Sequence, residues 1–415
     1  MTLAADIKTI LEKAVTAPNG PAGLVYGAVD AKGNFLVCEA AGKRVLGKDE
    51  PMTTDSFFPL FSTTKLLATI GALQLVEQGK LSLDEPIHTV LPEILKVNYL
   101  KPDGTLVEPA PRAWTEKITL RILLSHTSGF GYGFFNSSLE KLWRQRGGPD
   151  ELNGTREGTL DTPLTFEPGT RWQYGVGIDW AGEAIARVSG LGLGEYLKQN
   201  VFAPLGVADE ITFRLTPAQA AKLVGHHQRG PDGVLRPAEH LGLVHNATFE
   251  SAGAGALGTA GGYLTVLSAL LNGGVGANGA RILKEETVKS MFVNQVPDGV
   301  PGLGETIVPA RPELTNPVPT PPGMRKGWGL SFELNLVNSL LLFVTGFLFH
   351  FAQDPLPTGR SANSGLWAGL ANLYYTVDPT KGVATMILSQ SFPFFDPAVL
   401  APLLDAEQVI YASLT

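Results

Sequence analysis

The two ends of the chain carry matching elements, and this limits the possible folds more than any other feature. Residues 3–15 have the apolar spacing of an amphipathic helix, and residues 23–44 look like a β-hairpin around a turn at 30–33. Residues 396–414 look like a closing helix. Before them, three segments have the pattern of strands: residues 329–334, 369–378 and 382–390. The simplest assembly is one antiparallel sheet built from both ends and covered by the terminal helices.

The middle of the chain mixes helices with long loops. We expect helices from Thr119 and over residues 181–190, 194–206 and 263–274. A glycine-rich loop on the substrate side is expected at 251–262, and residues 297–323, with eight prolines, are expected to form a long loop.

The predicted fold class is α+β, in one catalytic domain over 1–415. The sheet subdomain would comprise roughly 1–62 and 325–415, and a helical and loop subdomain roughly 63–324.

Composition excludes several classes of function. The chain has 415 residues and is 44% hydrophobic, which is enough for a large core. Its net charge is −7 and it has no long basic run, so no nucleic-acid partner is expected. Cys38 is the single cysteine, so neither an internal disulfide nor a cysteine-rich metal site can form. The first residues lack the pattern of a secretory signal, so a cytoplasmic protein is expected.

One apolar insertion does not fit the scheme. Residues 334–353 contain no Asp, Glu, Lys or Arg, and their length would suffice for a membrane helix. The segment interrupts the terminal strands and has no positive flank beside it, which argues against a membrane span. Membrane contact stays an alternative. So do a buried or interfacial hairpin, an acyl-chain-binding lid and a stretch foreign to the functional protein.

A serine and a lysine stand three positions apart in FPLFSTTKLL (58–67). If a helix begins here, Ser62 and Lys65 share one face about one turn apart. A serine needs a base within hydrogen-bonding distance to act as a nucleophile, and burial makes a lysine such a base by lowering its pKa. The apolar run that follows predicts this burial, and Gly79 predicts the end of the helix. The alternative is a helix-capping serine followed by an ordinary surface lysine.

The spacing alone does not decide between these alternatives. Ser138 and Lys141 repeat it within the polar stretch 136–146, NSSLEKLWRQR. Acidic and basic neighbours surround this second pair, so we expect the start of a surface helix there.

Distant segments decide the question. Ser-x-x-Lys is the signature of the serine β-lactamase and penicillin-binding-protein superfamily. Four further segments resemble its class C-related members in order and spacing: GKLSLDEPIHTVLPE (79–93), ITLRILLSHTSGF (118–130), FEPGTRWQYGVGIDWAG (166–182) and GLWAGLANLYYTVDP (365–379). The likeness covers nearly the whole chain. It is closest to the family VIII-type esterases and to the fungal lovastatin-type acyltransferases, which share the Asp-Trp-Ala-Gly that begins at Asp179.

This resemblance implies a β-lactamase/transpeptidase-like fold and a role for each motif residue. Ser62 would be the nucleophile, with Lys65 and Tyr174 as the bases that move its proton. A phenol near the lysine ammonium is expected to have a lowered pKa. His126 belongs to a segment that is structural in the family, so it is not expected to act as a base.

Two positions depart from the β-lactamases. Those enzymes carry Tyr-x-Asn and Lys-Thr-Gly, whereas here Val176 takes the Asn position and Trp-Ala-Gly stands at 367–369. Both changes disfavour β-lactam hydrolysis and favour an ester or thioester with an apolar acyl group. Trp367 and Gly369 are therefore expected to contact the substrate. By resemblance, the backbone N–H groups of Ser62 and Leu370 would form the oxyanion hole.

The predicted function is acyl transfer through an acyl-Ser62 intermediate, by a transesterase or acyltransferase or by a carboxylesterase, with secondary metabolism as a candidate setting. The donor would be a small-molecule ester or thioester or an acyl-carrier protein, and the acceptor water or an alcohol. No cofactor is expected and no metal, because His226 and His227 lack a third ligand at a metal spacing. The alternatives are a β-lactamase or D-Ala-D-Ala peptidase-like hydrolase, and a non-catalytic member damaged by the 334–353 insertion.

Overall fold

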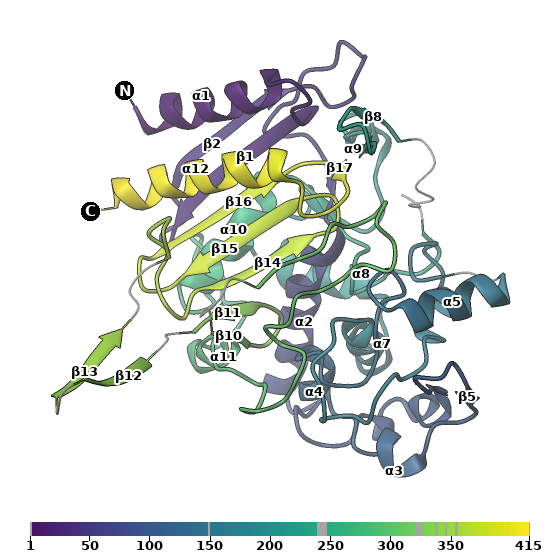
Figure 1. The fold of residues 1–415 in the computed structure, drawn as a ribbon. Coiled ribbons are helices and arrows are strands. Elements are labelled where there is room, and N and C mark those ends of the chain that lie inside the picture. The colour runs from purple at the N-terminus through teal and green to yellow at the C-terminus, as the bar shows by residue number, and fades with distance from the viewer. Residues whose placement is uncertain are drawn as a thin grey trace.

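A seven-stranded antiparallel sheet forms the centre of the structure, with strand order β10-β11-β14-β15-β16-β1-β2 (Figure 1). The computed structural model describes residues 2–147, 150–238, 247–320, 325–336, 339–344, 347–352 and 356–414. The strands of the sheet are β1 (Gly23–Asp30), β2 (Phe35–Gly42), β10 (Lys326–Trp328), β11 (Glu333–Asn335), β14 (Gly365–Gly369), β15 (Leu373–Asp378) and β16 (Val383–Leu388).

The two ends of the chain meet inside this sheet. β1 pairs with β16 from Val25 opposite Leu388 to Asp30 opposite Val383, while β2 pairs with the other edge of β1. β15 and β16, within the predicted strand segments 369–378 and 382–390, pair antiparallel as a hairpin. The prediction of one antiparallel sheet built from both ends, and with it the α+β class, is confirmed.

Helices cover both faces of the sheet. α1 (Leu3–Thr16) and α12 (Pro397–Ser413) lie side by side on one face, and α10 (Ala260–Leu271) packs against β1 and β16 on the other (Figure 1). Alternate residues of β1 point to opposite faces, so Tyr26 joins the core under the terminal helices and Val25 the core under α10. The strand is therefore apolar up to its last residue, Asp30.

α2 (Thr64–Glu77) is the central helix of the remaining region and is buried on nearly every side. It packs against α7 (Gly177–Ser189) and α8 (Leu193–Leu197). Gly71 makes the close approach to α8 possible, because a Cβ there would lie 2.9 Å from a methyl carbon of Leu197. Gly79, with φ +68°, follows the end of α2 as predicted. The subdomain boundaries themselves stay a prediction.

Short elements make up the rest of the described chain. The helices are α3 (Arg112–Thr115), α4 (Leu120–Leu124), α5 (Ser137–Arg146), α6 (Arg156–Leu160), α9 (Pro217–Ala220) and α11 (Glu285–Met291). Single turns occur at η1 (Phe61–Thr63), η2 (Ile87–Thr89), η3 (Pro92–Lys96) and η4 (Lys198–Phe202). The small sheets are β3-β9-β6 (Phe58–Pro59, Leu257–Gly258, Ile211–Thr212), β17-β7-β8 (Ser391–Phe392, His227–Arg229, Leu235–Pro237) and β4-β5 (Tyr99–Leu100, Leu106–Val107). The β3-β9 pair brings the glycine-rich segment beside the start of α2.

Two predicted strands are interrupted by turns. The predicted strand 329–334 begins with a turn between β10 and β11, in which the Gly329 N–H donates to the Phe332 carbonyl at 2.9 Å. The predicted strand 369–378 breaks between β14 and β15, where Asn372 has φ +61° and its side chain donates to the Ser391 carbonyl at 2.7 Å. A side-chain hydrogen bond to strand β17 fixes this reversal, so apolar patterning did not reveal it.

The apolar insertion forms strands over its described backbone. β12 (Ser339–Val344) and β13 (Phe347–Ala352) pair antiparallel as a separate sheet that projects from the body (Figure 1). Within the described ranges, no helix has the length and apolar character needed to cross a membrane. The cytoplasmic location and the function of the insertion stay predictions.

Candidate active site

Ser62 lies where the chain leaves β3 and approaches α2. The preceding residue, Phe61, has φ +46°, a left-handed conformation that costs a non-glycine residue about 1–2 kcal/mol. Tertiary contacts hold it there: the Leu60 N–H donates to the Ala256 carbonyl at 2.8 Å, and the Phe61 ring packs edge-on against Phe392. Ser62 therefore sits in the tight turn η1, ahead of the helix, whereas the sequence predicted the helix to begin at this serine.

Lys65 faces Ser62 as the spacing predicted. Its Nζ donates to the Ser62 Oγ at 3.2 Å, to the Tyr132 hydroxyl at 2.9 Å and to the Gly253 carbonyl at 2.8 Å. The lysine is 0% exposed. Three partners from different parts of the chain thus fix the amine beside the serine.

Burial changes the acid–base behaviour of this amine. Removal of the ammonium from water lowers the pKa of Lys65 to about 7, although the nearby Asp179 carboxylate opposes the shift. This direction agrees with the expectation from the apolar helix. Near pH 7 the neutral amine is well populated and can take a proton from Ser62.

Tyr174 lies just before α7 and close to the amine. Its hydroxyl accepts a hydrogen bond from the Trp367 Nε1 at 3.2 Å, and its ring centroid is 4.7 Å from the Lys65 Nζ. The structure therefore brings the second predicted base to the same place as the first.

The expected lowering of the Tyr174 pKa is wrong. Burial raises the pKa of this phenol above its ordinary value, although hydrogen bonds with Ser62 and Trp367 oppose the shift. An amine whose own pKa is about 7 carries only part of a positive charge at neutral pH, which is too little to offset desolvation. Tyr174 is therefore a neutral phenol around pH 7.

Strand β14 brings Trp-Ala-Gly at 367–369, the third motif after Ser-x-x-Lys and the Tyr174 segment, next to Ser62. A Cβ at Gly369 would lie 2.8 Å from the Leu60 carbonyl oxygen, so only glycine lets the strand pass this close to the turn before the nucleophile. A cavity of about 390 Å³ opens here. The predicted residues that line it are Ser62, Tyr174, Trp367, Gly369 and Leu370.

Most of the cavity wall near Ser62 is apolar. Phe134, Phe135 and Trp172 line it, together with Ile307 and Val318 of the predicted long loop. Backbone hydrogen bonds of 3.0 and 2.9 Å between those two loop residues stiffen the loop. The proline-rich segment thus forms part of the wall of the site.

Three residues that surround the lysine were not predicted from the sequence. Tyr132 and Gly253 accept its hydrogen bonds, and Asp179 is a buried carboxylate that interacts with it electrostatically. Weak signals existed, because Tyr132 follows the matched segment 118–130 by two positions and Asp179 lies inside a matched motif. No spacing rule, however, links any of them to Lys65.

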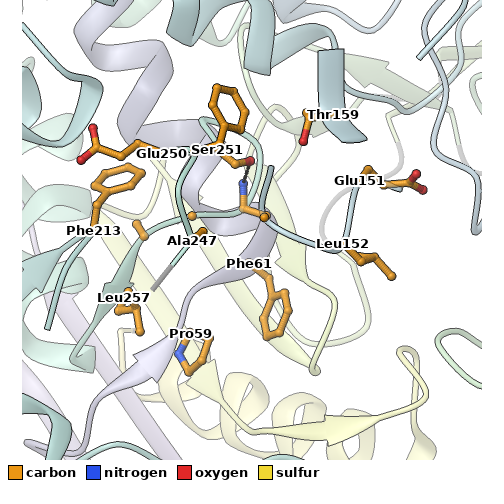
Figure 2. Close-up of a pocket in the computed structure, with 15 residues that line it drawn as sticks. Pro59, Phe61, Glu151, Leu152, Thr159, Phe213, Ala247, Glu250, Ser251 and Leu257 are labelled. Atoms are coloured by element: carbon orange, nitrogen blue, oxygen red, sulfur yellow. Dashed lines mark hydrogen bonds between the residues drawn. The ribbon is translucent and has the colours of Figure 1, made fainter. Parts of the chain in front are cut away.

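The glycine-rich loop borders a second, smaller pocket of about 90 Å³ (Figure 2). Phe61 and Ser251 line it, and the Ser251 Oγ accepts a hydrogen bond from the Ala254 N–H at 3.0 Å (Figure 2). The same hydroxyl donates to Asp179 at 2.6 Å. Ser251 therefore ties its own turn to helix α7.

The remaining serine and histidine candidates lie outside the catalytic geometry. His126 is buried against the Tyr174 ring, 4.7 Å between centroids, and its Nδ1 accepts from the Gly175 N–H at 3.4 Å. Ser138 lies in α5, capped by Asn136, with Lys141 exposed as expected of a surface helix.

The residues considered as metal ligands serve the fold. His227 accepts from the Leu46 N–H at 2.9 Å through Nε2, and its Nδ1 lies 3.2 Å from the Gln390 carbonyl. Across the described ranges, no group of three or more His, Cys, Asp or Glu side chains could hold a metal ion.

Comparison with known proteins gives consistent matches. The family described as Beta-lactamase matches residues 20–410. Monacolin J acid methylbutanoyltransferase of Aspergillus terreus is 30% identical over 98% of this chain and 95% of its own. Lovastatin esterase of Penicillium rubens is 35% identical over 76% and 79% of the two chains. The structure of simvastatin synthase (LovD) from Aspergillus terreus superposes with a TM-score of 0.80 at 28% identity, covering 100% and 99% of the two chains.

Proposed function

The chain belongs to the Beta-lactamase family, and we propose that it transfers acyl groups from ester or thioester donors through a covalent intermediate on Ser62. The family predicted from the motifs is thus confirmed, as is its kinship with acyltransferases and esterases. The observation that carries the proposal is the 3.2 Å contact between the Ser62 Oγ and the amine of the buried Lys65, beside a cavity lined by Ser62.

The first step forms the acyl-enzyme. Neutral Lys65 takes the proton of the Ser62 hydroxyl while the Oγ bonds to the donor carbonyl carbon, and the π electrons move to the carbonyl oxygen. The tetrahedral intermediate then collapses, and its bond to the leaving oxygen or sulfur breaks. The neutral phenol of Tyr174 donates its proton to that leaving group. The Lys65 ammonium then gives its proton to the phenol, so both bases return to their neutral forms.

The developing oxyanion needs hydrogen-bond donors. We assign this role to the backbone N–H groups of Ser62 and of Leu370 at the end of β14. The close passage of Gly369 beside Leu60 supports the assignment, because it places the end of the strand next to the nucleophile.

The second step reverses the first with a new nucleophile. An alcohol or water loses its proton to the same Lys65–Tyr174 pair, attacks the acyl carbon and releases Ser62 with its proton restored. An alcohol gives a new ester and water gives the acid. The relatives include one protein named for each outcome, so both acceptors belong to the proposal.

The lining of the cavity favours an apolar acyl group over a β-lactam. Trp367 holds the position where β-lactamases carry a lysine, and its N–H is engaged with Tyr174. Among the described lining residues, the cations Lys326 and Arg360 lie 3.2 and 3.7 Å from glutamate carboxylates. The proposed donor is therefore a small-molecule ester or thioester, and an acyl-carrier protein as donor stays a prediction.

Mass spectrometry of the intact protein tests the mechanism. After mixing with an acyl thioester or a nitrophenyl ester, we expect one acyl adduct, which disappears in Ser62→Ala and persists in the matched variant Ser138→Ala. Absence of any adduct in the unmodified protein would support the non-catalytic alternative. Adding an alcohol and measuring new ester against free acid then separates transfer from hydrolysis.

A further inference from the structure

A buried carboxylate on α7 is connected to the lysine through a single glycine. Asp179 is 1% exposed, and its Oδ1 accepts from the Gly253 N–H at 3.0 Å and from the Ser251 hydroxyl at 2.6 Å. The carbonyl of the same Gly253 accepts from the Lys65 Nζ at 2.8 Å. One residue thus joins the acid to the amine.

The glycine at this joint is required by space. A Cβ at position 253 would lie 2.5 Å from the Asp179 Oδ2 and 2.9 Å from the Tyr132 hydroxyl. Ser251 completes the arrangement, since its hydroxyl donates to Asp179. The same hydroxyl accepts from the Ala254 N–H (Figure 2). The turn at 251–254 is therefore fixed by the carboxylate from one side and by its own hydrogen bonds from the other.

Charge adds a second link. The lysine ammonium and the Asp179 carboxylate stabilise each other, while burial disfavours the charged form of both. Four other titratable groups interact with this pair: His126, Tyr132, Tyr174 and Glu183. The two tyrosines and the histidine are buried and are not cations at neutral pH. Asp179 is therefore the group that supports a positive charge on the amine.

We propose that Asp179 is a positioning residue for Lys65. Its carboxylate holds the 251–254 turn so that the Gly253 carbonyl receives the amine, and its negative charge favours the ammonium over the neutral form. This inference rests on the proposed function, because it concerns the base that activates Ser62.

The Asp179→Asn variant separates charge from shape. An asparagine keeps an oxygen acceptor for Ser251 and Gly253 but removes the negative charge. Loss of that charge lowers the pKa of Lys65 further. The acid limb of the pH–rate profile, where acylation slows because the lysine becomes protonated, should therefore move to lower pH by about one unit. The measurement is the rate of Ser62 acylation by a neutral nitrophenyl ester across the acid and neutral range.

Two further variants serve as controls. Ser251→Ala keeps the charge and weakens the turn, so we expect a several-fold slower acylation with the acid limb in place. Asp405→Asn makes the same change as Asp179→Asn at an exposed carboxylate of α12, and both the rate and the acid limb should stay as in the unmodified protein.

The outcomes discriminate clearly. If the acid limb of Asp179→Asn coincides with that of the unmodified protein, the charge role is overturned. If Ser251→Ala acylates at the unchanged rate, the positional role is overturned, and this test holds even if Asp179→Asn does not fold. A folded Ser62→Ala variant that still acylates would instead reject the proposed function. Loss of acylation in Ser62→Ala with an unshifted Asp179→Asn rejects this inference alone.

Discussion

Replacing Lys65 by methionine should abolish acylation and also remove a pH dependence from the stability of the fold. Methionine has a similar length and no charge, so it can take the buried position of the lysine side chain. The three hydrogen bonds of the amine are lost, and the Gly253 carbonyl and Tyr132 hydroxyl lose a partner. That loss costs stability at every pH, whereas the lysine titration acts only in a defined window.

The window follows from the change in pKa. Lys65 has a pKa of about 7 in the folded protein against 10.5 ordinarily. Between these values the unfolded chain keeps a proton that the folded protein has released, so the free energy of unfolding rises with pH. From pH 7 to pH 9 the free energy of unfolding rises by about 2 kcal/mol. A full proton difference would give about 1.36 kcal/mol per pH unit, and the folded protein is still partly protonated near pH 7, which makes the rise smaller. Below the folded pKa both states are protonated and the slope disappears.

Urea unfolding followed by tryptophan fluorescence measures this difference. The unmodified protein should gain about 2 kcal/mol in free energy of unfolding relative to Lys65→Met between pH 7 and pH 9. The dependence of this free energy on urea concentration should stay the same. Titrating groups that do not interact with Lys65 contribute equally to both proteins and cancel. The exposed Lys141→Met variant should show no such increase. A difference for Lys65→Met that stays constant with pH would refute the argument that burial lowers the pKa of this amine.

Three other substitutions test the contacts of the site. Trp367→Phe keeps the ring but removes the N–H that donates to Tyr174, so kcat should fall about 3–10-fold, and an unchanged kcat would contradict this assignment. Tyr132→Phe removes an acceptor of Lys65, and we expect a similar loss in acylation rate with an intact fold by circular dichroism. Gly253→Ala should lower the free energy of unfolding by about 1–3 kcal/mol by urea titration, because its Cβ would lie 2.5 Å from a carboxylate oxygen; unaltered stability would show that the turn can relax.

The sequence was sufficient for contacts set by local spacing. Ser62 lies in η1 and Lys65 in the first turn of α2, which follows it directly, so the three-residue spacing still brings the two side chains together. The sharing of one antiparallel sheet by the two chain ends also followed from the apolar pattern, whereas the particular pairing of β1 with β16 was not predicted.

Contacts between distant segments were not predictable in the same way. Gly253 lies 188 positions from Lys65 in the sequence, and its contact with the lysine is made by a backbone carbonyl. Every residue has such a carbonyl, so the residue type gives no sign of this contact. The φ of Phe61 is set by the β3-β9 pair and by packing, while its own side chain disfavours that conformation. The pKa of Tyr174 was misjudged because the resemblance supplied its neighbours but not how completely the fold excludes water from them.

The order of pKa values assigns the two bases different tasks. Near pH 7 Lys65 titrates, so it can both take and return a proton, while burial keeps the Tyr174 phenol protonated. A neutral phenol cannot start the reaction as a phenolate, but it can donate its proton to a leaving oxygen as the ammonium replaces it. The Trp367 N–H donates to the oxygen of that phenol, so the proton of the Tyr174 hydroxyl stays free to face the reacting atoms. A tryptophan in the third motif therefore suits a relay that ends on an alcohol or thiol, because it orients the phenol without adding a charge.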